Sequence, residues 1–278
     1  MKSLFLLVLS CLSCHSAVIR DLAYVEGGHE RQKLDLHLPA NKGKGGAPVL
    51  IAIHGGAWAF GDKANFGFAK PKFQWFNEQG FIVASINYRL SPAVTHPSHI
   101  EDVCQAVAWV EDHIAKHGGD PKKIYLIGHS AGAHLAALVA VDEKRLKVAG
   151  GNPESIKGVI LLDGAAYHVP KQVATSFRKD NMFSRAFTHD KKTQQDASPT
   201  LKVALMNGTP PPYLILHVAN RKESRSQSEE LAEALKAKGG KAEVLAIEGK
   251  THGSINRDMG KEGDATTTAE AKFLKSIE

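Results

Sequence analysis

The chain has 278 residues, of which 43% are hydrophobic and 23% charged. This composition excludes a disordered chain and suits one large α/β domain with a substantial core. The formal net charge is +6. Because the basic residues are scattered, with no aromatic residues interleaved among them, the sequence favours a solvated basic surface and gives no support to nucleic-acid binding.

Residues 1–16 are typical of a secretory signal. Lys2 precedes the apolar run Leu4 to Leu9, and small residues follow up to Ser16. The apolar run is too short to span a bilayer. We therefore expect a signal peptide over 1–16, no transmembrane span, and a secreted or periplasmic protein. The segment around Cys11 also resembles a lipoprotein box, and in that case Cys11 would carry a lipid anchor.

Strands and helices alternate along the rest of the chain, and continuous apolar strands such as 48–53 are typical of parallel strands covered on both faces. The first half predicts an edge-type strand over 33–39, strands over 48–53, 81–86 and 123–127, and helices over 69–79 and 100–116. The second half predicts strands over 156–162, 213–218 and 242–247, and helices over 226–238 and 266–277. This repeated β–α order predicts a doubly wound, mostly parallel sheet.

One long segment, 164–211, interrupts the alternation. It has low periodicity and includes the polar run 178–181. Long irregular insertions between sheet strands are usually functional, so we expect a small cap over a site. The sequence has no internal repeat and no linker, and it therefore predicts a single domain over 17–278.

Ser130 lies at a predicted junction between a strand and a helix. The pattern Gly128-His129-Ser130-Ala131-Gly132 follows the apolar strand and precedes an Ala-rich helix. This is the context of a nucleophile elbow, in which a strained turn admits only glycine on either side and exposes the serine hydroxyl. The N–H of Ala131, at the start of the helix, would point at an oxyanion formed there.

A serine at neutral pH needs a base to take its proton, and the chain has 14 histidines to choose from. His252 follows the last predicted strand, at the carboxyl edge of the sheet, where the elbow also lies. The run His54-Gly55-Gly56-Ala57 follows the strand 48–53 at the same edge. Its consecutive glycines would let backbone N–H groups turn inward as oxyanion donors.

Other kinds of chemistry have weaker support. We expect Cys104, in the middle of a periodic helix, to be a core residue. His113 and His117, like His96 and His99, lack a third ligand at a recognisable spacing, so no metal site is predicted. Because the chain has no dinucleotide motif and no phosphate loop, we expect no cofactor.

From about residue 30 to the C-terminus the sequence resembles the α/β-hydrolase superfamily, and within it the carboxylesterases with a His-Gly-Gly motif. These include the hormone-sensitive-lipase-like, feruloyl-esterase-like and kynurenine-formamidase-like branches. The resemblance is carried by 54–58, 61–63, 87–92, 101–103, 120–121 and 128–132. It implies an α/β-hydrolase fold and a hydrolase acting on a small-molecule carboxylic ester through an acyl-enzyme. It also implies roles for Ser130 as nucleophile, His252 as base, and the N–H groups of Gly56, Ala57 and Ala131 as the oxyanion hole.

The chain departs from this family pattern at the third catalytic residue. The aspartate expected seven residues before Gln227 is Asn220, and an amide cannot stabilise an imidazolium by charge. Three explanations remain open. In the first, another carboxylate replaces it, with Asp163 at the end of strand 156–162 as the leading substitute and Glu223 and Glu248 as others. Alternatively, Asn220 itself orients His252 in a weakened enzyme, or the chain is a catalytically impaired relative that acts as a binding protein.

Overall fold

The computed structural model describes residues 17–40, 45–64, 66–175 and 180–277. The predicted signal over 1–16, including Cys11, lies outside the described residues. None of the helices in the described ranges is long and apolar enough to cross a membrane.

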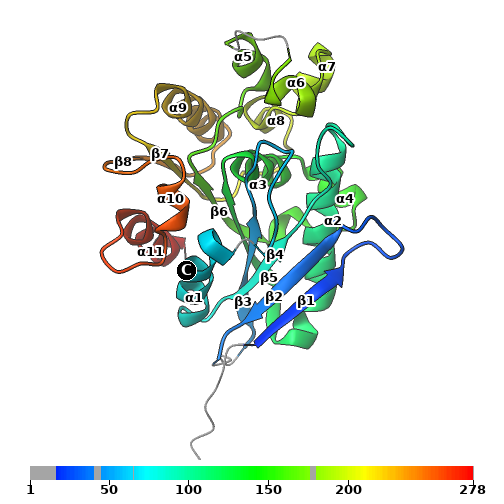
Figure 1. Ribbon diagram of the computed structural model, residues 1–278, viewed down its shortest axis with the longest axis vertical. Helices are drawn as coiled ribbons and strands as arrows, with labels where there is room; N and C mark the ends of the chain where they lie inside the picture. Colours follow the sequence, from blue (N-terminus) through cyan, green and yellow to red (C-terminus); the bar gives the residue numbers. More distant parts are fainter. Residues whose placement is uncertain (1–16, 41–44, 65, 176–179, 278) are drawn as a thin grey trace, which may run out of the picture.

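One sheet of eight strands runs through the molecule in the order β1-β2-β4-β3-β5-β6-β7-β8 (Figure 1). All pairs from β4 onward are parallel, whereas β1–β2 and β2–β4 are antiparallel. The doubly wound, mostly parallel sheet predicted from the sequence is therefore confirmed. The strands are β1 (Ala17–Ala23), β2 (Lys33–Leu38), β3 (Ala47–Ile53), β4 (Ile82–Ile86), β5 (Gly119–His129), β6 (Ile156–Leu162), β7 (Tyr213–Val218) and β8 (Ala242–Ile247).

Helices cover both faces of this sheet and account for its apolar strands. One face packs on α2 (Ser98–His113), α3 (Ala131–Val141) and α9 (Lys222–Ala237). The other packs on α1 (Phe66–Glu78), α10 (Ser254–Arg257) and α11 (Ala265–Ile277). Alternate residues of each central strand enter the two cores, as Leu50 and Ile51 do in β3, because successive strand side chains point to opposite faces. Cys104 on α2 is fully buried, as predicted.

The prediction of an edge strand over 33–39 is wrong. β2 lies between β1 and β4 and is buried, and β1 forms the edge instead. The alternating polar residues that indicated an exposed face are paired inside. Asp35 accepts a bond of 2.6 Å from Lys63, and the ring of His37 lies 4.9 Å from that of Phe73.

Residues between β6 and β7 fold into short helices: α5 (Val169–Ala174), α6 (Met182–Phe187), α7 (Lys191–Asp196) and α8 (Pro199–Val203). They lie beyond the carboxyl edge of the sheet, at the top of Figure 1. Asp196 ties them to the body through His96 Nε2 at 2.7 Å and Arg145 Nη2 at 2.8 Å. Further connections are α4 (Glu143–Val148) and the 3-10 turns η1 (Ile114–His117) and η2 (Pro153–Ser155).

Candidate active site

Ser130 lies in a strained turn between β5 and α3. Its φ is 56° and its ψ −118°, a conformation that L-residues rarely adopt. The two flanking glycines are required by space, because a Cβ at Gly128 would lie 2.1 Å from the carbonyl oxygen of Gly132, and one at Gly132 would lie 2.1 Å from that of Ile53. The Ser130 N–H donates to the Leu162 carbonyl at 3.0 Å, and this bond anchors the turn to the end of β6.

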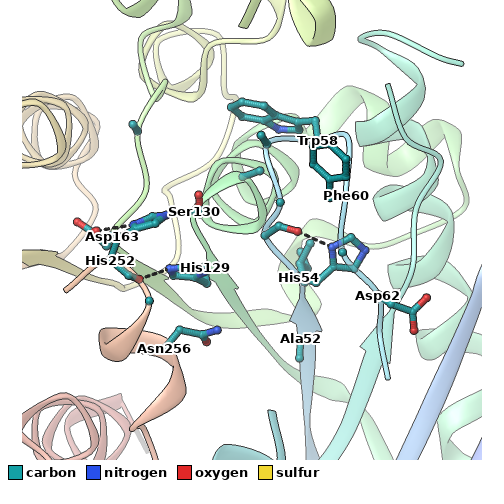
Figure 2. Close-up of a pocket in the computed structure, with 18 of the residues that line it drawn as sticks. Ala52, His54, Trp58, Phe60, Asp62, His129, Ser130, Asp163, His252 and Asn256 are labelled. Carbon is teal, nitrogen blue, oxygen red and sulfur yellow. Dashed lines mark hydrogen bonds and ion pairs between the residues drawn. The ribbon is translucent and has the colours of Figure 1, made fainter. Parts of the chain in front are cut away.

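Three side chains predicted from the sequence meet above the ends of β5, β6 and β8. Ser130, Asp163 and His252 line one cavity, and Figure 2 shows the His252 ring between the Asp163 carboxylate and Ser130. Nδ1 of His252 lies 2.7 Å from Oδ2 of Asp163. Nδ1 of the ring thus contacts a carboxylate, as the base of a catalytic triad contacts its acid, and no described residue forms a hydrogen bond with Nε2.

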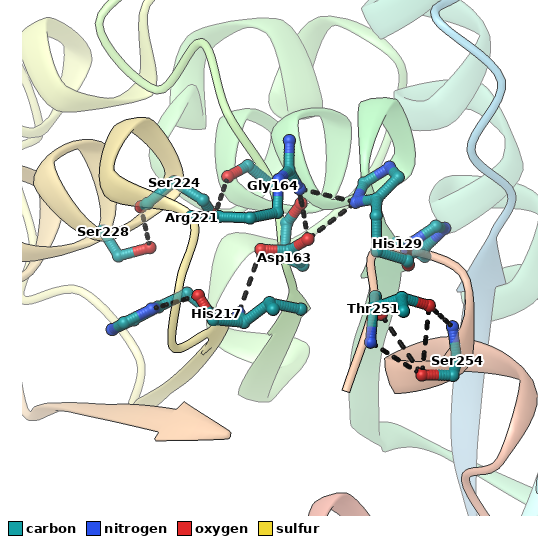
Figure 3. A network of polar contacts seen from close by, with 11 residues as sticks. His129, Asp163, Gly164, His217, Arg221, Ser224, Ser228, Thr251 and Ser254 are labelled. Atoms are coloured by element: carbon teal, nitrogen blue, oxygen red, sulfur yellow. Dashed lines mark hydrogen bonds and ion pairs between the residues drawn. The ribbon is translucent and has the colours of Figure 1, made fainter. Parts of the chain in front are cut away.

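Asp163 is fully buried at the end of β6 and is held from several sides (Figure 3). Its Oδ1 accepts from the N–H of Val218 at 3.1 Å, and its Oδ2 contacts Nη1 of Arg221. Although burial raises the pKa of this carboxyl, hydrogen bonds from His252 and Val218 and the contact with Arg221 outweigh it and hold the pKa well below its usual range. Asp163 is therefore an anion at neutral pH.

Asn220, at the family's acid position, is not part of this cluster. Its side chain is exposed, and so are those of Glu223 and Glu248. Of the four candidates for contact with Nδ1 of His252, the structure brings only Asp163 to it.

Arg221, the residue after Asn220, was not singled out from the sequence. Its Nη1 lies 2.6 Å from Nδ1 of His252 as well as against Asp163. A guanidinium can only donate hydrogen bonds, and a carboxylate can only accept them. When Nδ1–H of His252 donates to Asp163, Arg221 cannot also donate to Nδ1. The favourable interaction of Arg221 in this cluster is then its ion pair with Asp163. No sequence pattern identifies this role, because it depends on where the β7–α9 turn meets β6.

His129 is a second residue that sequence reasoning missed, although it stands inside the elbow motif. Its Nε2–H donates to the carbonyl of His252 at 2.7 Å, and the two rings lie 4.5 Å apart. Burial, with a smaller contribution from His252, lowers the pKa of His129 to about 3, so the ring is neutral. His129 therefore fixes the loop that presents His252 without adding a charge beside it.

The loop after β3 presents backbone N–H groups to the same cavity. Nδ1–H of His54 donates to the Gly55 carbonyl at 2.7 Å, and its ring stacks on Tyr88 at 4.4 Å. Burial lowers the pKa of His54 to about 4. The ring is therefore neutral, and it stabilises the loop by its hydrogen bond and its stacking contact without acting as a base. Within the described residues, no backbone carbonyl accepts the N–H of Gly56 or Ala57, and both residues line the cavity together with Ala131.

The cavity has a volume of about 710 Å³ and extends on both sides of Ser130. Trp58, Phe60, Met182 and Phe183 line its apolar part, so the helices between β6 and β7 contribute to its wall. Trp58 is buried and donates from Nε1 to Nδ1 of His134 at 3.3 Å, which makes it a packed wall. Phe60, in contrast, is 72% exposed.

Among the described residues, no group of three or more His, Cys, Asp or Glu side chains is placed to hold a metal ion. Nδ1–H of His113 donates to the Trp109 carbonyl, and the His113 ring stacks on the indole ring of Trp109. His96 pairs with Asp196, and His99 contacts the Ser91 hydroxyl.

Comparison with known proteins gives a consistent result. Residues 34–235 match the BD-FAE family model. A probable isoprenylcysteine alpha-carbonyl methylesterase of Arabidopsis thaliana is 33% identical over 249 residues, covering 84% of this chain and 51% of the relative. Esterase LipC of Mycobacterium tuberculosis is 30% identical over 245 residues, covering 83% and 59%. The chain thus spans about half the length of the curated relatives it matches.

Solved structures show the same fold. Esterase B of Lactobacillus rhamnosis has a TM-score of 0.77 at 21% identity, covering 94% of this chain and 85% of that one. The carboxylesterase EstE1, cloned from a metagenomic library, has a TM-score of 0.70 at 23% identity, with coverages of 95% and 90%.

Proposed function

The chain belongs to the BD-FAE family and has the α/β-hydrolase fold, and from this premise we propose that it is a serine hydrolase that cleaves carboxylic esters through an acyl-enzyme at Ser130. The observation that carries the proposal is the contact of 2.7 Å between His252 and Asp163 in the cavity that contains the strained Ser130. Named esterases among the relatives support the class of reaction.

In the acylation step, Ser130 Oγ attacks the ester carbonyl while Nε2 of His252 takes its proton. Asp163 keeps the other ring proton on Nδ1 and stabilises the imidazolium that forms. The N–H groups of Gly56, Ala57 and Ala131 receive the oxyanion, and removing one such donor in other enzymes costs about 10²–10³ in kcat. The carbonyl then reforms, and the bond to the alcohol oxygen breaks as that oxygen takes the proton from His252.

Deacylation repeats these steps with water. Nε2 of His252 removes a proton from the water as its oxygen attacks the acyl carbon. The second tetrahedral intermediate collapses, Ser130 Oγ leaves with the proton held by His252, and the free acid departs. Each proton taken is returned, so the reaction as proposed needs no cofactor.

The other candidate function, an impaired hydrolase that acts as a binding protein, was based on Asn220 in the acid position. The buried anionic Asp163 on His252 favours the enzyme over this alternative.

We also propose that the protein is exported and lacks residues 1–16 when mature. The support is the order of charged, apolar and small residues in that segment. Mass spectrometry of the chain recovered from its native host tests this proposal and would also detect a lipid on Cys11.

A fluorophosphonate probe tests the nucleophile directly. We expect one probe per chain on the wild type and none on Ser130→Ala, with the same thermal unfolding midpoint for both. An unlabelled wild type that folds normally would rule out the proposed mechanism.

A further inference from the structure

The cavity around Ser130 has a polar end that the proposed ester chemistry does not use. Lys72 on α1 and Asn256 on α10 both line it, and Nζ of Lys72 donates to Oδ1 of Asn256 at 2.6 Å. In Figure 2 Asn256 lies at the lower end of the pocket and Trp58 at the upper end, with Ser130 and His129 between them.

Lys72 is a buried cation with unused donors. Its residue is only 7% exposed, and burial lowers the pKa of the ammonium to about 8, so it is mostly charged at neutral pH. An ammonium has three donors, and within the described residues only Asn256 accepts one of them. Nδ2 of Asn256 likewise donates to no described acceptor.

Glu270 on α11 is the nearby carboxyl group that could neutralise Lys72, but it does not do so. It is fully buried, neither of its oxygens receives a hydrogen bond from the described residues, and it forms no ion pair with Lys72 there. Burial raises the pKa of Glu270 well above its usual value, and the charge of Lys72 only partly offsets this. No ion pair with a carboxylate of the described residues therefore neutralises Lys72, and its charge and remaining donors are available to a ligand.

Lys72 shares this cavity with Ser130 and His129. Its charge also makes a small contribution to the lowered pKa of His129, after burial and His252. A substrate that extends from Ser130 along the cavity can therefore contact Lys72.

We propose that Lys72 and Asn256 form a subsite for a carboxylate on the part of the ester remote from the bond that is cleaved. The ammonium and the amide N–H₂ supply charge-assisted donors to its two oxygens. This inference rests on the proposed function and names its substrate class as esters that carry a free carboxylate, such as monoesters of dicarboxylic acids.

The test compares kcat/KM for 4-nitrophenyl esters of monocarboxylic acids with those for 4-nitrophenyl monoesters of dicarboxylic acids of matched chain length. A parallel series places the carboxylate on the alcohol part. For each enzyme the readout is the ratio of kcat/KM between carboxylate and neutral ester. The test variants are Lys72→Met, which removes the ammonium, and Asn256→Asp, which places a carboxylate against Lys72. The control is Lys70→Met, because Lys70 is an exposed lysine on the same helix.

In at least one series we expect the ratio to fall by about 10- to 100-fold in Lys72→Met and in Asn256→Asp, mainly through KM, which is the range of a charge-assisted hydrogen bond. Lys70→Met should keep the wild-type ratio. An unchanged ratio in both test variants, or a wild type that prefers the neutral ester at every chain length in both series, overturns the subsite while leaving ester hydrolysis intact. A wild type that hydrolyses neither kind of ester overturns the proposed function instead. Should Lys72→Met fail to fold, Asn256→Asp decides.

Discussion

The ends of β6 and β7 lie side by side at the carboxyl edge of the sheet, yet they meet His252 differently. β6 ends in Asp163, which is fully buried and 2.7 Å from Nδ1 of His252. β7 leads to Asn220, which is exposed. The end of β7 still serves the site, because the Val218 N–H donates to Asp163 at 3.1 Å. The difference teaches that the contact with His252 is decided by the burial of the carboxyl and the donors around it, and not by the strand that the family pattern names.

The largest effect expected from this comparison is that of Asp163→Asn. Replacing the acid of a triad by its amide lowers kcat by about 10⁴ in a serine protease, and the same loss is expected here because the amide cannot stabilise the imidazolium. Steady-state kinetics with a short 4-nitrophenyl ester measures it. A loss of less than tenfold would mean that Asp163 is not the acid.

Arg221→Gln should have a smaller effect. The substitution removes the ion pair on Asp163 and leaves its hydrogen bonds from Val218 and His252. We expect kcat to fall by about tenfold, corresponding to roughly 1.4 kcal/mol. Arg225→Gln is the matched control, since Arg225 is exposed in the first turn of α9, which Arg221 directly precedes, and it pairs only with Glu229 within the described residues. Equal effects of the two variants would show that the contact of Arg221 with Asp163 is irrelevant.

The pH dependence of stability should differ between substitutions at Asp163, after β6, and at Asn220, after β7. The pKa of Asp163 is lowered in the folded state, so its contribution is present above the unfolded pKa of about 3.9 and is lost as pH falls through the folded value. The gap in urea midpoint between wild type and Asp163→Asn should therefore be larger at pH 7 than at pH 3. For Asn220→Ala, no gap that changes with pH is expected.

The smallest effect is expected for Asn220→Asp, which restores the family's acid. Because the wild-type site already has a buried carboxylate on His252, kcat/KM should change by less than about threefold. A rise of orders of magnitude would show that Asn220 limits the enzyme and that Asp163 is a poor substitute.

Much of the fold could be predicted from local patterns. A strand such as β3 is a continuous apolar run because both of its faces are buried. Gly128 is required by a backbone contact only four residues away, with Gly132, although Gly132 itself is required by the distant carbonyl of Ile53. β2 was misjudged because Asp35 and His37 find partners on elements that are distant in sequence. The helices α5 to α8 are only five or six residues long, which is too short for a hydrophobic period to emerge.

The candidate site was predictable only in part, because some of its contacts join residues that are distant in sequence. Ser130, His252 and the loop at Gly56 follow strand ends, and parallel strands bring such ends to one edge. The choice between Asp163 and Asn220 depends on which side chain points inward, and the supports from His129 and Arg221 depend on loops that meet in space. The sequence contains these residues but no local pattern that pairs them.

The central claim, that the carboxylate at the end of β6 holds the Nδ1 proton of His252, can be measured by ¹H–¹⁵N NMR of the imidazole. We predict a protonated Nδ1 with a strongly deshielded proton in the wild type and in Asn220→Ala, and the loss of that signal in Asp163→Asn. An unprotonated Nδ1 in the wild type, as expected if Arg221 donates to it, would contradict the account, and so would a signal that survives in Asp163→Asn.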